Sequence, residues 1–250
     1  MKIGFLLLLE SVQIVTVRSQ CNRGEAILEE SLYPLQNNFN LESAGQNTSV
    51  TGSRMWTNGI VPFTIDSAYT HQDKLNIQKV LNTIVNSTCI KFLPNKGCTS
   101  RSYVHLTSRT QFTGAVGMIG GRQTAGESRR NLVRLGEAAH QLFHTLGFVH
   151  EEQRADADNF VSFGPNGCGP FLGRMRQIYP NQLGDFDFES VTSRMRTGYR
   201  RGSRCQTRAR DPSMDSRIGR TKNGPTTLDL EKVNRAYMCQ RTSTRRTGGK

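Results

Sequence analysis

Three histidines within eleven residues place the strongest constraint on the fold of this chain. The stretch "HQLFHTLGFVH" begins at His140, and His144 follows four residues later. On a helix this spacing puts both imidazoles on one face, so that they can bind the same ion. Gly147 suits the left-handed position that ends a helix, and a turn there lets His150 approach the same ion. The pattern predicts a helix over 136–147 and a zinc site of three imidazoles.

The segment before the histidines alternates between strand and helix patterns. β-branched and aromatic residues, or alternating polarity, predict strands over 59–67, 89–94 and 102–108. Between the first two strands, the stretch 70–88 predicts a helix, because its apolar residues recur at helical spacing. These residues are Ile77, Val80, Leu81, Ile84 and Val85. The glycines of 114–123 are typical of an edge strand or a turn.

The segment after the histidines has a different pattern. Residues 155–225 are irregular and rich in glycine, proline and arginine. An amphipathic helix is predicted over 226–239, with Thr227 as its cap.

The N-terminal segment has the pattern of a secretory signal. A basic residue precedes an apolar run, which predicts a signal peptide over 1–19. We expect a loosely packed leader over 20–53, one folded domain over 54–240 and a disordered basic tail over 241–250. No stretch supplies the roughly 20 mostly apolar residues of a membrane anchor. The expected product is a secreted protein with no membrane association.

The cysteines and sequons fit an extracellular protein. The six cysteines form no CxxC pair, and their even number allows all of them to form disulfides in an oxidising compartment. Sequons beginning at Asn47 and Asn86 predict a glycoprotein.

Positive charge is concentrated late in the chain. The formal net charge is +13, and residues 194–210 contain seven arginines and no acid. This segment is either a solvated loop or a contact for a polyanion, with Arg200, Arg201 and Arg204 at its centre. Outside the cell such a partner is a sulfated glycan or an acidic protein, and no nucleic acid is expected.

The stretch "HQLFHTLGFVHEEQRADAD" resembles the extended zinc-binding motif of the astacin family of secreted metallopeptidases. Further segments resemble that family in the same order: "TNGIVPFTID", "STCIKFLP", "GMIGGRQ", "FDFESV" and "IGRTKNGPTTLDLEKVNRAYMC". The resemblance implies an α+β fold of the zincin (metzincin) type, with a twisted mixed sheet, two helices over a cleft and an irregular C-terminal half. It also implies one zinc ion per chain and a disulfide between Cys89 and Cys239.

The chain departs from this family at the position that matters most for catalysis. The resemblance implies a glutamate directly after the first histidine, which takes a proton from the zinc-bound water. Gln141 occupies that place, and an amide cannot accept and return a proton near neutral pH. Glu151 and Glu152 are poor substitutes, because in the family the glutamate after the third histidine serves structure.

Further departures follow. After "FDFESV", Thr192 and Arg194 stand where the family has the methionine and the tyrosine of its Met-turn. Met195 could restore the methionine in a shifted register, but that shift would not restore the tyrosine. The second family disulfide would need cysteines near Phe112 and Leu132, and neither is present.

Three functions remain open at this stage. The first is a zinc-binding astacin homologue of impaired catalysis. Such a pseudoenzyme would hold a peptide or protein ligand in the cleft that serves as the active site in the family. The second is an active zinc metalloendopeptidase, a hydrolase that cleaves peptide bonds through a zinc-bound water. The third is a secreted structural protein whose histidines are simply packed.

Overall fold

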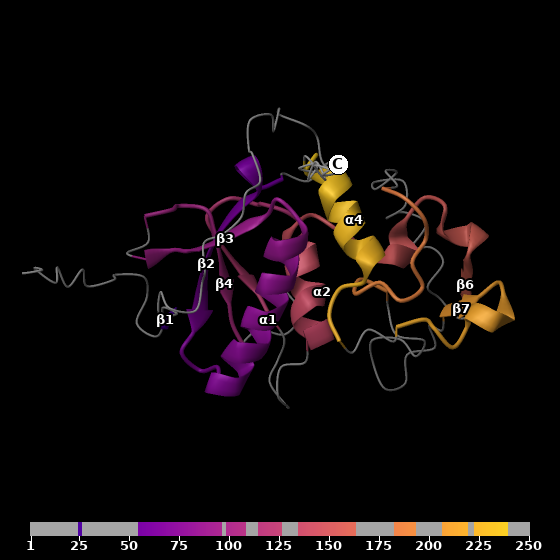
Figure 1. The fold of residues 1–250 in the computed structure, drawn as a ribbon, viewed down its shortest axis with the longest axis horizontal. Helices are drawn as coiled ribbons and strands as arrows, with labels where there is room; N and C mark the ends of the chain where they lie inside the picture. Colours follow the sequence, from indigo (N-terminus) through magenta and orange to yellow (C-terminus); the bar gives the residue numbers. More distant parts are fainter. Residues whose placement is uncertain are drawn as a thin grey trace, which may run out of the picture.

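The computed structural model describes residues 25–26, 55–96, 99–108, 115–126, 135–163, 183–193, 207–219 and 223–239. Within these residues the α-helices are α1 (His71–Ser87), α2 (Leu135–Thr145) and α4 (Thr227–Ala236), labelled as in Figure 1. The strands are β1 (Glu25–Ala26), β2 (Ile60–Asp66), β3 (Lys91–Pro94), β4 (Tyr103–Leu106), β5 (Arg122–Ala125), β6 (Val161–Phe163) and β7 (Thr207–Ala209). Short 3-10 helices span Thr57–Gly59, Glu151–Gln153, Ala157–Asn159 and Pro212–Met214.

The first half of the domain is built on a mixed sheet with β2 in its interior. β2 pairs in parallel with β3 along its first half and with β4 along its second, and β4 pairs in parallel with β5. β1, from the segment predicted as a leader, pairs antiparallel with the end of β2. β5 is therefore the last strand on the other edge. The mixed sheet and the two helices α1 and α2 confirm the predicted α+β fold class.

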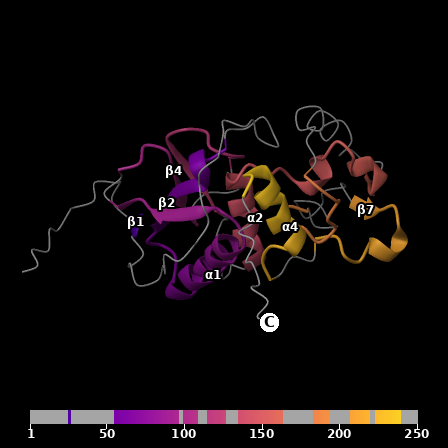
Figure 2. The ribbon, with the colours of Figure 1, turned by 45° about the horizontal axis from the view of Figure 1, so that its top comes forward.

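The main core lies between this sheet and the helices. Side chains of β2, β4, α1 and α2 form one apolar cluster, in which Val61, Ile84 and Ala139 are completely buried. α1 and α2 pack against each other, and α4 lies next to α2 in both Figure 1 and Figure 2. Burying these apolar faces supplies the main driving force for this half of the fold.

Helix α1 forms as its sequence predicts. Its apolar face is buried, apart from Val85, which is only partly covered. At its start, the Thr70 hydroxyl accepts from the Asp73 N–H at 3.2 Å, and the Thr70 N–H donates to the Asp73 carboxylate at 3.0 Å. This capping box satisfies backbone donors that have no partner within the helix.

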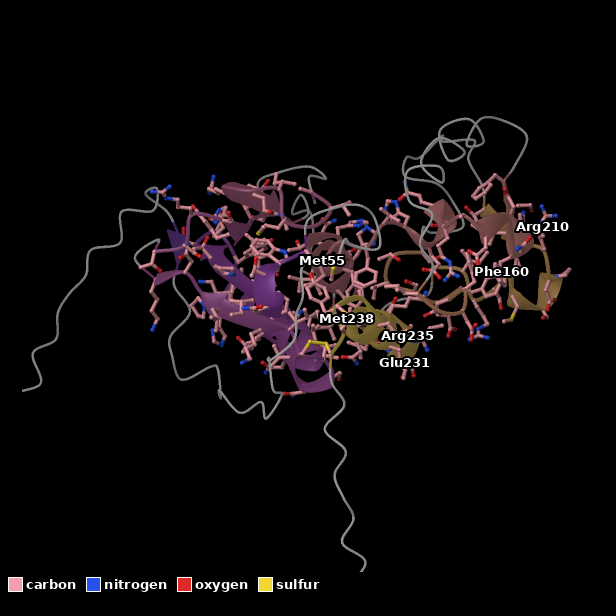
Figure 3. The ribbon with its side chains drawn as sticks, turned by 90° about the horizontal axis from the view of Figure 1, so that it is seen from above. Met55, Phe160, Arg210, Glu231, Arg235 and Met238 are labelled. Carbon is pink, nitrogen blue, oxygen red and sulfur yellow. A yellow bond between two sulfur atoms is a disulfide. The ribbon has the colours of Figure 1, made fainter. Side chains whose placement is uncertain are left out.

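The cap of helix α4 lies one residue earlier than predicted, while the helix itself, predicted over 226–239, spans Thr227–Ala236. Thr226, not Thr227, is the cap, since its hydroxyl accepts from the Asp229 N–H at 3.0 Å and its own N–H donates to the Asp229 carboxylate at 3.0 Å. A capping box requires a spacing of three residues, which Thr226 and Asp229 provide. At the other end, the predicted disulfide between Cys89 and Cys239 is confirmed and ties α4 to the segment that precedes β3. Figure 3 shows it beside Met238.

The strands β2, β3 and β4 are each shorter than the ranges predicted for them, which were 59–67, 89–94 and 102–108. Of the glycine-rich segment 114–123, the described residues 115–121 form a turn, since Gly117, Gly120 and Gly121 have positive φ angles, and the edge strand β5 begins only at Arg122. Strong periodicity locates an element, but the backbone hydrogen bonds decide where it ends.

In the second half of the domain, after His150, the described residues between 155 and 225 form only short 3-10 helices and two short strands, as their irregular sequence pattern predicted. A two-stranded antiparallel pair, β6 and β7, lies at its far end, where the Arg210 N–H donates to the Phe160 carbonyl at 2.8 Å (Figures 1 and 3). Phe160, Phe186 and Phe188 form a small aromatic cluster beside it. Among the described residues, none of the helices has the length and apolar content needed to cross a membrane.

Candidate metal centre

Helix α2 carries the first two histidines on one face. The Nε2 atoms of His140 and His144 lie 2.9 Å apart. The helix places them there because residues four apart are neighbours on its surface. Ala139, Leu142 and Phe143 are buried and anchor the helix in the main core.

A glycine turn brings the third histidine to the same point. Gly147 has a φ angle of 101°, in the left-handed region, and its N–H donates to the His144 carbonyl at 2.9 Å. The chain then reverses, and the Nε2 atom of His150 reaches a position 3.2 Å from that of His144. The predicted role of Gly147 as the end of the helix is confirmed, because the turn follows directly after α2.

Two aromatic side chains hold this end of α2. The Trp56 indole donates to the Thr145 carbonyl at 2.9 Å, and the Tyr237 hydroxyl donates to the Leu146 carbonyl at 3.0 Å. Burial raises the pKa of the Tyr237 phenol, so the group remains a donor at physiological pH. The carbonyls at the end of the helix thus find partners from distant parts of the chain.

The hydrogen bonds of two imidazoles decide their tautomers. Nδ1 of His140 donates to the Val191 carbonyl at 2.6 Å, and Nδ1 of His144 donates to the Phe148 carbonyl at 2.7 Å. A carbonyl only accepts, so in the neutral imidazoles the proton sits on Nδ1 and Nε2 carries a lone pair. The two Nε2 lone pairs therefore face each other, an arrangement that a cation between them stabilises.

The three histidines fit zinc in number, chemistry and spacing. Their ligand nitrogens all lie within 4.8 Å of one another. Tetrahedral zinc with Zn–N bonds of about 2.0–2.1 Å needs ligand nitrogens about 3.3 Å apart, close to the observed 2.9 Å and 3.2 Å. His144 and His150 are buried, whereas His140 is only half-buried. The predicted ligand set is brought together as a zinc-binding triad.

Gln141 lies beside this centre on α2. It is 5% exposed, and its Oε1 atom has no hydrogen-bond partner within the described part of the chain. It precedes His144 by three residues, so both lie on the same side of the helix. The position directly after the first predicted metal ligand is therefore taken by a neutral amide, which can donate or accept a hydrogen bond but cannot take up a proton near neutral pH.

The segment 187–193, whose Val191 carbonyl accepts from His140, is held in place by an acidic residue of α4. Asp229 accepts from the Ser190 hydroxyl at 2.6 Å and from the Val191 N–H at 2.9 Å, across 38 residues of sequence. The same Val191 offers its carbonyl to His140, so the chain of contacts runs from α4 to a metal ligand. Burial raises the pKa of Asp229, although hydrogen bonds from Ser190, Val191 and Thr226 oppose the shift.

Thr192 occupies the place expected for the Met-turn methionine. It is 3% exposed, and its hydroxyl lies 2.9 Å from the Ser190 hydroxyl. The apolar residue is thus replaced by one that joins a polar network. Arg194, which stands at the position of the family tyrosine, lies outside the described residues. So does Met195, which could restore the methionine in a shifted register.

A buried ionic cluster supports the loop that carries His150. One oxygen of Glu151 accepts from Lys232 Nζ at 2.6 Å, from Arg154 Nη1 at 2.8 Å and from the Asp187 N–H at 2.9 Å. Both charges of the Glu151–Lys232 pair are almost fully buried, with side-chain exposures of 6%. Glu151 is therefore bound into the structure, which agrees with its expected structural role.

Arg154 links this cluster to the irregular half. It forms a two-pronged ion pair with Asp156, at 2.9 Å and 2.8 Å, and donates to the carbonyls of Gly184 and Asp185. Burial alone would lower the pKa of Arg154, but its contacts with Asp156 and Glu151 outweigh burial and raise it. The guanidinium is therefore a permanent cation at this site.

Sequence patterns did not identify Lys232 or Asp229 as support for the metal centre. The available signal was the spacing of Thr226 and Asp229, which marks a helix start but says nothing about Ser190 or Val191. These contacts arise only when α4 packs against the segment 187–193 and against the loop after His150.

The other predicted site residues have different outcomes. Asn86 is exposed near the end of α1, where a glycan would find room, although its glycosylation stays a prediction. Asn47, Arg200, Arg201 and Arg204 lie outside the described residues.

The sequence is similar to a known protein family and to named proteases of other organisms. The model of the peptidase family described as Astacin matches residues 48–238. A zinc metalloproteinase of Caenorhabditis elegans, nas-14, is 28% identical over 193 residues, which are 74% of this chain and 38% of the relative. The low choriolytic enzyme of Oryzias latipes is 27% identical over 235 residues, 92% of this chain and 85% of the relative. The chain thus spans well under half of the first relative's length.

Solved structures show a similar fold. High choriolytic enzyme 1, a hatching enzyme zinc-protease from the medaka Oryzias latipes, matches with a TM-score of 0.61 and 24% identity. The match covers 75% of this chain and 94% of that chain. At this identity the likeness establishes the fold alone.

Proposed function

Since this chain belongs to the astacin family of zinc metallopeptidases, we propose that it binds zinc but hydrolyses peptides very slowly or not at all. It then acts by holding a peptide or protein ligand at the metal centre. The observation that carries this proposal is Gln141, a buried neutral amide in the general-base position beside a complete set of metal ligands. Loss of a general base costs about 10² to 10⁴ in rate.

The chain's own residues fit a binding role. His140, His144 and His150 would hold the zinc ion, which supplies a Lewis acid for a carbonyl or carboxylate oxygen of the ligand. Gln141 can orient that ligand by a hydrogen bond. The irregular half, through Val191 and the Glu151 cluster, keeps the imidazoles in place.

The alternative, an active metalloendopeptidase, needs another proton acceptor near the metal. Glu151 is held by Lys232 and Arg154, and Glu152 is 1% exposed with its carboxylate 3.4 Å from the Ser193 hydroxyl. Neither carboxylate belongs to the group of ligand nitrogens, which contains only histidines among the described residues. These contacts favour the binding role.

Secretion belongs to the same proposal. The N-terminal apolar segment and the disulfide between Cys89 and Cys239 both support an oxidising, extracellular location. The similar proteins include a low choriolytic enzyme and a hatching enzyme zinc-protease, but these names describe the activities of those proteins and not of this chain.

The test measures zinc content and peptide turnover on one purified sample, with Gln141→Glu and His144→Ala beside the wild type. We expect one zinc per wild-type chain, little turnover, and a partial gain in Gln141→Glu, because one of two missing catalytic groups is restored. His144→Ala should lose zinc. Rapid wild-type cleavage that a chelator abolishes would establish the active-enzyme alternative, and absence of zinc after metal loading would favour packed histidines.

A further inference from the structure

The charges around the three histidines are unbalanced in favour of an anion. As zinc ligands the imidazoles of His140 and His144 are neutral, with Nδ1 of each donating to a carbonyl, and Gln141 adds no charge. The nearest acid in sequence, Glu151, already meets two cations, Lys232 and Arg154. No carboxylate joins the ligand group among the residues that the structure describes. A divalent ion held there keeps its full charge of +2, which attracts an anionic ligand.

Gln141 adds a group suited to such a ligand. Its side chain is only 5% exposed, and Oε1 has no hydrogen-bond partner within the described residues, so the amide can exchange a hydrogen bond with a group bound at the centre. A half-turn of the amide exchanges its oxygen for an N–H donor at the same point. An ionised glutamate at this position offers acceptors only and repels a second carboxylate.

We propose that the metal centre is a carboxylate-binding site, at which Gln141 donates a hydrogen bond to the bound carboxylate. The proposal rests on the proposed function, namely that zinc occupies the three histidines without rapid proteolysis. The ligand class is a peptide that presents a carboxylate, from its C-terminus or from an acidic side chain. The exchange of glutamate for glutamine thus changes the preferred ligand of the centre as well as removing a base.

The first arm of the test uses calorimetry on the zinc-loaded full chain at pH 7. Three short peptides of otherwise identical sequence are compared: one with a free C-terminal carboxylate and no acid, one amidated with a single glutamate, and one amidated with glutamine instead. We expect at least one carboxylate peptide to bind about tenfold or more tightly than the neutral peptide. The tighter of the two identifies the source of the carboxylate. Equal affinity for all three overturns the proposal.

The second arm uses acetate, which no variant can cleave, and the visible spectrum of the cobalt-loaded protein. We expect acetate to change the cobalt absorption bands of the wild type. Gln141→Glu should weaken acetate binding by roughly tenfold to a hundredfold at pH 7, because two carboxylates then share the site. Gln141→Met stays neutral but loses the donor, and a weakening of roughly threefold to tenfold is expected. Gln72→Glu, on the exposed face of α1, adds the same charge elsewhere and should leave binding unchanged.

Proton uptake gives a further readout that a change in packing would not move. The glutamate of Gln141→Glu must take up a proton when acetate binds, so the variant should bind about one proton more than the wild type. Equal acetate affinity in wild type, Gln141→Glu and Gln141→Met overturns the inference. If zinc is bound and cleavage is absent, that result leaves the proposed function intact, whereas missing zinc or rapid cleavage refutes the proposed function itself.

Discussion

The two halves of the domain are held together in different ways. Around the sheet, strands pair through their backbones and apolar side chains of α1 and α2 fill the core. Below the histidines, the segment 183–193 has no strand or α-helix, and charged or polar side chains bind its backbone instead. This difference indicates that the first half anchors the metal ligands through the packing of α2, while the second half sets their orientation through hydrogen bonds such as that from His140 to the Val191 carbonyl.

Two helices with the same start signal show this contrast in detail. α1 and α4 both begin with a threonine and an aspartate three residues later, in a capping box. Asp73 performs this role for α1. Asp229 performs it for α4 and in addition binds Ser190 and Val191, next to the carbonyl that receives His140. The same local motif thus acquires a second role only in the irregular half.

The largest expected effect concerns the buried ionic cluster. Glu151→Gln leaves Lys232 and Arg154 as neighbouring buried cations, so the free energy of unfolding should fall by about 3–5 kcal/mol. Ile84→Val, in the apolar half, should cost about 0.5–1.5 kcal/mol. Urea denaturation of the zinc-free proteins measures both. An equal cost for the two substitutions would contradict the view that the irregular half depends on its charges.

Removing the metal should loosen one half more than the other. With free zinc at about a hundred times its Kd, a chelator should lower the free energy of unfolding by about 2.7 kcal/mol. Hydrogen exchange should then accelerate in the described residues 187–193 and 150–154 more than in α1, since His140 and His150 connect the ion to those segments. Equal acceleration throughout would show that the two halves unfold as one unit.

The two aspartates separate capping from metal support. Asp229→Ala should weaken zinc binding about 10-fold, because it releases Val191, whose carbonyl is the direct partner of His140, and loss of a direct partner commonly costs about 10- to 100-fold. Asp73→Ala removes a similar cap, worth about 1 kcal/mol of stability, and should leave zinc affinity unchanged. Zinc titration with a competing chelator gives both affinities. If both substitutions weaken zinc alike, the effect comes from general stability and not from the contact with Val191.

The smallest effect on the fold should come from the arginine-rich segment. Replacing Arg200, Arg201 and Arg204 by serine should lower the salt concentration that elutes the protein from heparin, since clustered charge attracts polyanions. Zinc content and stability should not change, because the segment is predicted to be solvated. Unaltered retention would place heparin binding elsewhere or leave this segment as an ordinary exposed loop.

Local patterns predicted much of the fold and of the site. The apolar spacing of α1, the glycine at the end of α2 and the three histidines all act over a few residues, so their geometry follows from helix periodicity and backbone freedom. The resemblance to the astacin family added the disulfide between Cys89 and Cys239, which the structure confirms. The cap of α4 was misplaced by one residue because two threonines stand side by side there.

What the sequence by itself determined is the ligand set and the missing base: His140, His144 and His150 come from spacing, and Gln141 comes from its identity. Only the tertiary structure decided how these groups are held. Lys232 lies 81 residues from Glu151, and Asp229 lies 38 residues from Val191, yet both pairs are in direct contact. Such contacts depend on the packing of distant elements and leave no local periodicity, because a buried lysine or aspartate has the same sequence signature as an exposed one.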